Sequence, residues 1–129
     1  MNKLAILLVS ALIVIMLLVL TAPAKAEIHS DYDSAYAASN KDHKTFVVVI
    51  GADWCPPCKK MKAMIKANPS VADGGHLVIL DYKSPIALKL YKGSSVPALI
   101  RFKWDGKQWI KKTITGGQSY NQLKRFIRG

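Results

Sequence analysis

Three runs of apolar residues along the chain lack the alternation that is typical of half-exposed strands. The first covers residues 4–20 and is interrupted only by Ser10. The other two are short: Phe-Val-Val-Val-Ile at 46–50 and Leu-Val-Ile-Leu at 77–80. Since short continuous apolar runs suit strands that are covered on both faces, we expect 46–50 and 77–80 to be parallel strands within a sheet.

A hairpin and four helices are predicted around these two strands. Residues 98–102 and 109–114 flank Asp105-Gly106, a dipeptide typical of a hairpin turn. Apolar residues at helical spacing predict helices at about residues 31–40, 59–67, 85–92 and 120–127, with N-caps at Ser30-Asp31, Ser84 and Ser119. This order predicts an α/β fold, with a central mixed β-sheet of two parallel strands plus the antiparallel hairpin and with helices on both faces.

Residues 1–26 have the features of an export signal. Lys3 precedes the apolar run, and a small-residue A-x-A pattern ends at Ala26. Cleavage after this pattern leaves 27–129 as a single domain. The alternative is an uncleaved membrane anchor through residues 4–22, because about 20 apolar residues span a bilayer. In both cases we expect an exported, periplasmic or otherwise extracytoplasmic domain, because Lys3 keeps the start of the chain inside.

The chain of 129 residues is strongly basic. Its formal net charge is +11, which falls to +9 when Lys3 and Lys25 are removed with the leader. The lysines are scattered and no repeat of aromatic and basic residues accompanies them, so we expect no nucleic-acid partner. A solvated basic surface is the favoured interpretation, and attraction to acidic partners is the alternative. We expect the domain to be a monomer.

The two cysteines of the chain, Cys55 and Cys58, are separated by two prolines. In an exported protein the default use of two cysteines is a structural disulfide. A ring of this size constrains the unfolded chain very little, however, because stabilisation by a disulfide grows with the loop that it closes. Redox chemistry is therefore the favoured use of this pair.

Two other uses of a C-x-x-C pair fit the sequence poorly. Zinc would require two of the three histidines, His29, His43 and His76, yet no second C-x-x-C or H-x-x-x-H pair exists. We therefore expect no metal, and we expect the histidines to have surface or loop roles. Covalent haem attachment requires a histidine after the second cysteine, where Lys59 stands. No cofactor is expected.

Disulfide exchange requires a thiolate, and the predicted place of the cysteines favours one. The pair follows the strand at 46–50 and lies on the first turn of the next helix, at the strand end where catalytic sites collect. The unpaired N–H groups and the dipole of that helix stabilise an anion at Cys55. Cys58 lies one turn further along and can attack a mixed disulfide. Cys55 is thus the predicted nucleophile and Cys58 the resolving thiol.

The stretch Ala-Asp-Trp-Cys-Pro-Pro-Cys-Lys-Lys-Met at 52–61 resembles the active-site motif of the thioredoxin family. Further features follow in the family's order: Ser95-Val96-Pro97 at the place of its cis-proline loop, the hairpin, and a glycine near Gly116-Gly117 before the last helix. Together with Asn-Pro-Ser-Val at 68–71, the motif looks most like the exported thioredoxin-like domains of bacterial transmembrane thiol reductases.

The resemblance implies a thioredoxin fold and a thiol:disulfide oxidoreductase that uses Cys55 and Cys58 as a redox disulfide. It implies that Pro97 is cis and lies against the two sulfurs, and that the backbone of Val96 pairs with an extended substrate segment. Trp54 is expected either to contact partners or to shield Cys58. The implied partners are protein thiols and disulfides and, for an exported reductase, a thiol-electron donor in the membrane.

The active-site loop departs from many thioredoxins in two respects. Val49 stands where they carry a buried carboxylate that helps to move the proton of the resolving thiol, so water or another group must do that work. Pro56, followed by Pro57, removes an N–H and stiffens the dithiol, which favours the oxidised enzyme. We therefore expect a reductase, with a disulfide-donating oxidase as one alternative. The other alternative is a thioredoxin-fold binding or chaperone module whose disulfide is incidental.

Overall fold

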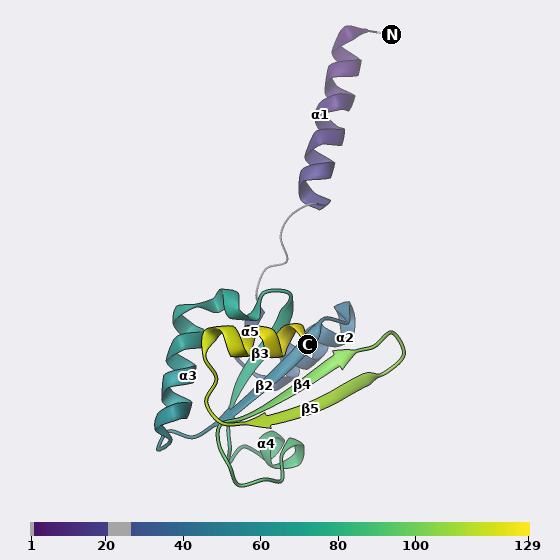
Figure 1. Cartoon of the computed structure of the whole chain (residues 1–129). Helices are drawn as coiled ribbons and strands as arrows, with labels where there is room; N and C mark the ends of the chain where they lie inside the picture. The colour runs from purple at the N-terminus through teal and green to yellow at the C-terminus, as the bar shows by residue number, and fades with distance from the viewer. Residues whose placement is uncertain (1, 21–26) are drawn as a thin grey trace.

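The computed structural model describes residues 2–20 and 27–129, and it arranges residues 27–129 around one mixed sheet (Figure 1). In chain order the elements are α1 (Lys3–Leu20), β1 (Glu27–His29), α2 (Tyr32–Asp42), β2 (Thr45–Gly51), α3 (Pro56–Ala67), the 3-10 helix η1 (Pro69–Ala72), β3 (Gly75–Asp81), α4 (Pro85–Leu90), β4 (Ala98–Trp104), β5 (Trp109–Thr115) and α5 (Tyr120–Arg128).

The five strands lie in the order β1-β3-β2-β4-β5. β1 and β2 run parallel to β3, whereas β4 is antiparallel to both of its neighbours, β2 and β5. The predicted α/β fold, with β2 and β3 as parallel strands and an antiparallel hairpin, is therefore confirmed. β1 adds a third parallel strand at the edge of the sheet. The sequence did not reveal it, because three residues, Glu-Ile-His, are too few to form a recognisable pattern.

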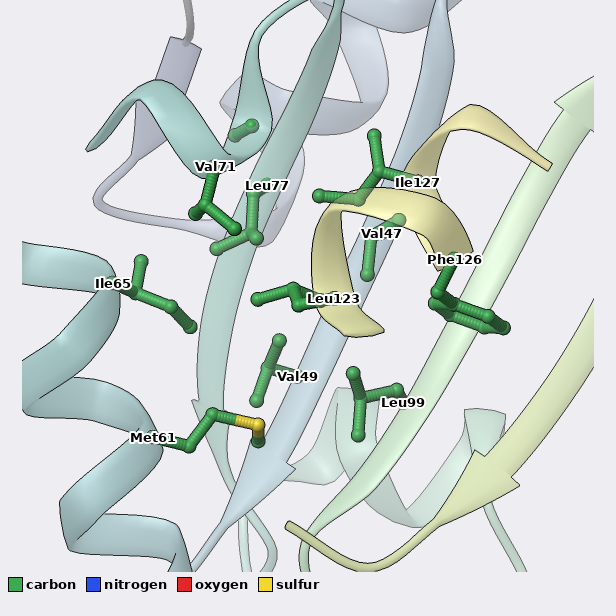
Figure 2. Close-up of a cluster of buried hydrophobic side chains, with 11 residues drawn as sticks. Val47, Val49, Met61, Ile65, Val71, Leu77, Leu99, Leu123, Phe126 and Ile127 are labelled. Atoms are coloured by element: carbon green, nitrogen blue, oxygen red, sulfur yellow. The ribbon is translucent and has the colours of Figure 1, made fainter. Parts of the chain in front are cut away.

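Side chains that alternate along β2 divide the core into two layers. Val47 and Val49 lie in the layer beneath α3 and α5, where they meet Ile65 and Leu123 of those helices (Figure 2). The opposite layer, beneath α2 and α4, takes the remaining buried side chains of the strand: Phe46, Val48 and Ile50. Because both of its faces are covered, β2 is the central strand that its continuous apolar run predicts.

Side-chain caps set the starts of three helices. Asp31, Ser84 and Ser119 each accept a hydrogen bond from the backbone N–H three residues later, at the starts of α2, α4 and α5. All three predicted caps are confirmed. α2 continues to Asp42, beyond its predicted end, and His43 closes it in the left-handed conformation with a φ of 56°.

α1 covers the apolar run of the predicted leader, and its side chains from residue 3 to residue 18 are exposed. Among the residues that the structure describes, no helix is both long and apolar enough to cross a membrane. The predicted cleavage site at Ala26 lies outside the described residues. Export, cleavage and anchoring therefore stay predictions.

Candidate active site

The two cysteines lie where β2 has ended and α3 begins. Cys55 is the N-cap of α3, with an extended backbone, and Pro56 and Pro57 follow it as the first residues of the helix. Proline suits the first helical turn, because its fixed φ is already helical and its missing N–H would have no partner there. The two prolines thus fix the start of the helix and with it the positions of both sulfur atoms.

A disulfide joins Cys55 and Cys58, whose Cα atoms are 5.2 Å apart. Both residues are nearly buried, with exposed fractions of 4% and 7%. They pack with Ala52 and against the partly buried side chains of Tyr82 and Val96. The structure therefore contains the predicted pair in its oxidised form, in a largely apolar environment.

The first turn of α3 offers few N–H groups to the sulfur of Cys55. Pro56 and Pro57 have none. The N–H of Cys58 donates to Cys55 Sγ over 3.3 Å, whereas the N–H of Lys59 donates to the backbone carbonyl of Cys55 over 3.0 Å. A thiolate at Cys55 is therefore stabilised by one hydrogen bond from this turn and by the helix dipole.

The peptide bond between Val96 and Pro97 is cis, as the resemblance implies. The carbonyl oxygen of Val96 lies 3.7 Å from Cys55 Sγ. On its other side this loop is held by the hairpin, because the N–H of Gly116 donates to the carbonyl oxygen of Pro97 over 2.8 Å. Gly116 has a φ of 96°, which favours glycine at this position. Residues from three separate parts of the chain thus meet at the disulfide.

Trp54 stands beside the disulfide and is 65% exposed. Its indole ring meets the ring of Tyr82 edge-on, with 5.8 Å between the ring centroids. Tyr82 is in turn held next to the site by the hydrogen bond from its N–H to the carbonyl oxygen of Gly51, over 2.9 Å. Most of the indole surface is therefore open to solvent, which agrees better with a partner contact than with a shield over Cys58.

Two hollows lie beside the segment that carries the disulfide. The larger one, of about 550 Å³, lies beside the active-site prolines and is mostly apolar. Its lining includes Met64, together with residues 117–119 from the loop before α5. This hollow is large enough to receive side chains of a protein that approaches the disulfide.

The smaller hollow, of about 210 Å³, opens beside Cys58 and Pro97. Its lining contains four charged residues: Asp53, Lys59, Lys62 and Asp81. The two hollows thus differ in character, with charged groups gathered on the side of Cys58.

Sequence reasoning missed Asp81. It is the last residue of β3 and the register partner of Gly51, so the parallel pairing of β2 and β3 brings its carboxylate to the active-site end of the sheet. The position could have been found, because parallel strands that lie side by side end at the same edge of a sheet. Asp81 is a carboxylate near Cys58 in a chain that has Val49 where many thioredoxins carry theirs.

None of the three histidines contributes to the lining of either hollow. His43 is exposed and stacks on Trp104, 4.5 Å between ring centroids. His76, in contrast, is only 1% exposed and makes hydrogen bonds with His29 and Asp42. The expectation of a surface or loop role is wrong for His76, because a histidine inside an apolar strand can be buried once its ring nitrogens find partners.

The family model described as Thioredoxin-like matches residues 27–103, which is more than half of the chain. The chain belongs to this thioredoxin-like family. No curated protein matches it in sequence.

Solved thioredoxin structures agree with the family assignment at the level of the fold. A thioredoxin from Thermus thermophilus superimposes with a TM-score of 0.64 at 15% identity, covering 81% of this chain and 85% of that one. A thioredoxin from Trichomonas vaginalis superimposes with a TM-score of 0.59 at 21% identity, covering 79% of this chain and 94% of that one. A chain from a complex of ferredoxin:thioredoxin reductase and thioredoxin f2 superimposes with a TM-score of 0.60 at 21% identity, covering 81% of this chain and 96% of that one.

The thioredoxin-like fold and its cysteine pair define the chemistry of the domain. The two thiols are close enough to form a disulfide, and they lie at the start of a helix next to a cis proline. The chain is a thiol:disulfide oxidoreductase of the thioredoxin-like family.

Proposed function

We propose that the protein is an exported reductase that transfers electrons from its Cys55/Cys58 dithiol to disulfides in other proteins. The observation that carries the proposal is the hydrogen bonding of the Cys55 sulfur. One N–H, that of Cys58, reaches this sulfur from the first helical turn, because Pro56 and Pro57 have none to offer.

The direction of electron transfer follows from which form of the enzyme is stabilised. Hydrogen bonds and positive charge at the Cys55 thiolate stabilise the reduced form and make a dithiol a better oxidant. Here that stabilisation is limited to one N–H and the helix dipole. The rigid pair of prolines reduces the entropy lost when the disulfide closes, so it favours the oxidised form. Both effects favour an enzyme that gives up electrons.

The catalytic cycle has two exchange steps. The Cys55 thiolate attacks one sulfur of a substrate disulfide, so that the substrate's S–S bond breaks and its released thiolate takes up a proton. Cys58 then loses its proton and attacks Cys55 Sγ, which releases the second substrate thiolate and closes the Cys55–Cys58 disulfide. Two electrons have passed to the substrate, and an external dithiol must return two electrons to the enzyme.

The substrate segment would lie along the cis-proline loop. The backbone of Val96 is the edge with which an extended peptide pairs, and the exposed indole of Trp54 contacts the partner. The apolar hollow beside Pro56 and Pro57 accepts side chains of the same partner. All three features belong to or border the loops that carry Cys55 and Pro97, which supports delivery of the substrate disulfide to the Cys55 sulfur.

The expected location and partners extend this proposal. An exported domain, whether released after Ala26 or anchored through residues 4–22, requires a thiol-electron donor in the membrane. The complex of thioredoxin f2 with ferredoxin:thioredoxin reductase is an example of a similar fold bound to a reductase. The domain is proposed to act as a monomer and not to bind nucleic acid.

Trapping of mixed disulfides tests the proposal. The full chain with Cys58→Ser is produced in bacterial cells, the thiols are blocked in acid, and disulfide-linked adducts are identified by mass spectrometry. We expect adducts with exported proteins through Cys55, and we expect the matched Cys55→Ser chain to give few. Equal, non-covalent binding of partners by both variants would support the binding module instead. Adducts with cytosolic proteins alone would contradict export.

A further inference from the structure

A second group of polar side chains lies at the amino ends of the parallel strands. It consists of Glu27 and His29 of β1, Asp42 of α2 and His76 of β3, and is called the histidine cluster below. Three atoms converge: His29 Nε2 lies 2.9 Å from His76 Nδ1, and Glu27 Oε2 lies 3.1 Å from His76 Nδ1 and 3.6 Å from His29 Nε2. The remaining ring nitrogen of His76, Nε2, lies 2.8 Å from Asp42 Oδ2.

The backbone brings these side chains together in a simple way. Glu27 and His29 are two residues apart in a strand, so their side chains leave the same face of the sheet. His76 is the register partner of Glu27 in the parallel ladder. Val78, two residues further along β3, packs in the layer beneath α2, and Asp42 ends that helix. The cluster is thus formed where the edge strand, its neighbour and the covering helix meet.

When His76 is neutral, the ring protons of the histidine cluster cannot satisfy all of its nitrogen and oxygen atoms. A carboxylate only accepts, so the hydrogen bond with Asp42 places the proton of a neutral His76 on Nε2. Nδ1 of His76 then carries a lone pair that faces both Glu27 Oε2 and His29 Nε2. The only proton available among these three atoms is one on His29 Nε2, and it can satisfy one of the other two atoms. A carboxylate oxygen and an imidazole lone pair 3.1 Å apart repel each other unless a proton or a metal cation lies between or beside them.

We propose that the histidine cluster binds one divalent transition-metal ion, with zinc as the best match, through Glu27, His29 and His76. Zinc binds imidazole nitrogen and carboxylate oxygen at about 2.0–2.2 Å, which sets tetrahedral ligand atoms about 3.3–3.6 Å apart and right-angled ones about 2.8–3.1 Å apart. The three separations in the cluster, 2.9, 3.1 and 3.6 Å, lie within this span. The three ligand atoms all lie within 4.8 Å of one another.

The surroundings supply the other features of a metal site. Asp42 holds the ring of His76 by its second nitrogen and so fixes both the orientation of the ring and the nitrogen that remains free. His76 is buried, the side chain of His29 is 16% exposed, and that of Glu27 is 54% exposed. An ion can therefore enter from the side of Glu27, and water completes its coordination there.

The metal would stabilise the pairing of the edge strand β1 with β3. β1 has three residues and pairs with β3 alone, so few backbone hydrogen bonds hold it. Two of the three proposed ligands belong to β1 and the third to β3. The site lies at the amino ends of β1 and β3, whereas the disulfide follows the carboxyl end of β2, so this inference does not depend on the proposed reductase activity.

Zinc binding by the oxidised full chain, in detergent and without a histidine tag, tests the proposal. The disulfide keeps Cys55 and Cys58 from binding the ion, and Zn²⁺ is titrated in competition with a chromogenic chelator. We expect one equivalent to bind. His29→Gln and Glu27→Gln should each lower the affinity by more than the roughly 10–100-fold loss that removal of an outer partner such as Asp42 causes.

His43→Asn is the matched control, because His43 is a histidine outside the cluster and asparagine tolerates its left-handed backbone. It should bind Zn²⁺ as the unchanged chain does. Each variant is checked for its fold by circular dichroism and by its thiol:disulfide exchange activity, which the proposal leaves unchanged. Absence of Zn²⁺ binding by the unchanged oxidised chain, or equal binding by His29→Gln, would overturn the proposal.

Discussion

The active site and the histidine cluster occupy opposite ends of the parallel strands, and they are built in opposite ways. The disulfide, its two prolines and the N–H that reaches Cys55 all belong to one stretch of chain, so the start of a single helix positions most of the chemistry. The hydrogen bonds of the cluster join residues 47 and 34 positions apart in the sequence. The comparison indicates that one short segment sets most of the redox chemistry, whereas the histidine cluster links distant segments and so contributes to the stability of the fold.

The two sites also differ in what surrounds their reactive atoms. Cys55 and Cys58 lie among apolar side chains, with Tyr82 and Val96 against them. The ring of His76 is just as buried, but each of its nitrogens faces a polar partner. Replacement of a residue at the disulfide should therefore change mainly the rate of disulfide exchange. Replacement of a residue in the histidine cluster should change mainly the free energy of unfolding.

The largest expected effect is the loss of turnover on removal of either cysteine. Cys55→Ser removes the proposed nucleophile and Cys58→Ser removes the thiol proposed to resolve the mixed disulfide, so reduction of a protein disulfide by dithiothreitol should fall to the uncatalysed rate. His29→Gln, as the matched change in the cluster, should leave the rate unchanged. A comparable loss of rate with His29→Gln would show that the two sites are coupled.

The next effect is on stability. His76→Ala removes a buried ring and leaves Asp42 Oδ2 without its hydrogen-bond partner, so the free energy of unfolding should fall by about 2–4 kcal/mol. His43→Asn, at an exposed position, removes the stacking on Trp104 and should change the free energy of unfolding by about 1 kcal/mol or less. Denaturant unfolding of the oxidised full chain with a chelator present measures both values. The comparison would break down if His76→Ala were as stable as the unchanged chain.

A smaller effect is expected on the reduction potential when an N–H is restored to the active-site helix. Pro57→Ala returns a donor at the second helical position, from which an N-cap side chain can accept. One further hydrogen bond to a charged sulfur is worth about 1.5–3 kcal/mol, which corresponds to a rise of about 30–60 mV. Pro56→Ala is the matched control for the loss of rigidity, and its potential should rise less, because the first N–H of a helix does not usually reach the cap.

Equilibration with glutathione measures the potentials of both proline variants. Equal potentials for Pro57→Ala and the unchanged chain would show that the missing N–H groups do not make this dithiol more reducing.

The smallest expected effect belongs to Asp81. If its carboxylate receives the proton of Cys58 through water in the small hollow, Asp81→Asn should slow substrate release near neutral pH. The loss should be below the roughly 10²-fold effect of a well-placed base. The reduction potential of the cysteine pair should stay unchanged, because a group that only speeds proton transfer leaves the free-energy difference between the oxidised and reduced enzyme as it was. Rates measured against pH are the readout, and a variant whose pH profile matches that of the unchanged chain would exclude this role.

Much of the fold could be predicted because its signals are local. The apolar runs of β2 and β3, the Asp-Gly turn and the caps at Asp31, Ser84 and Ser119 each lie within a few residues of the element that they define. The pair Cys55 and Cys58 was found for the same reason. β1 and η1 were not predicted, since three and four residues carry too little pattern and form only through contacts with the rest of the domain.

The parts that escaped prediction depend on pairing across the sheet. His76 looked like a loop or surface histidine, because nothing near it in the sequence indicates that Asp42 and His29 meet its ring. Asp81 becomes a neighbour of the active site only through the register of β3 with β2. The partners of His76 depend on long-range register, which one sequence does not reveal, whereas Asp81 could have been placed at the active-site edge once the two strands were expected to be parallel neighbours.

The reduction potential of the unchanged full chain tests the central claim most directly. The protein is equilibrated with glutathione buffers of graded composition, free thiols are alkylated, and the fraction of Cys55–Cys58 disulfide is measured. A reductase predicts a potential near thioredoxin's, about −270 mV, or lower. A value approaching about −120 mV, typical of a strong disulfide donor, would contradict the account and reverse the direction of electron flow.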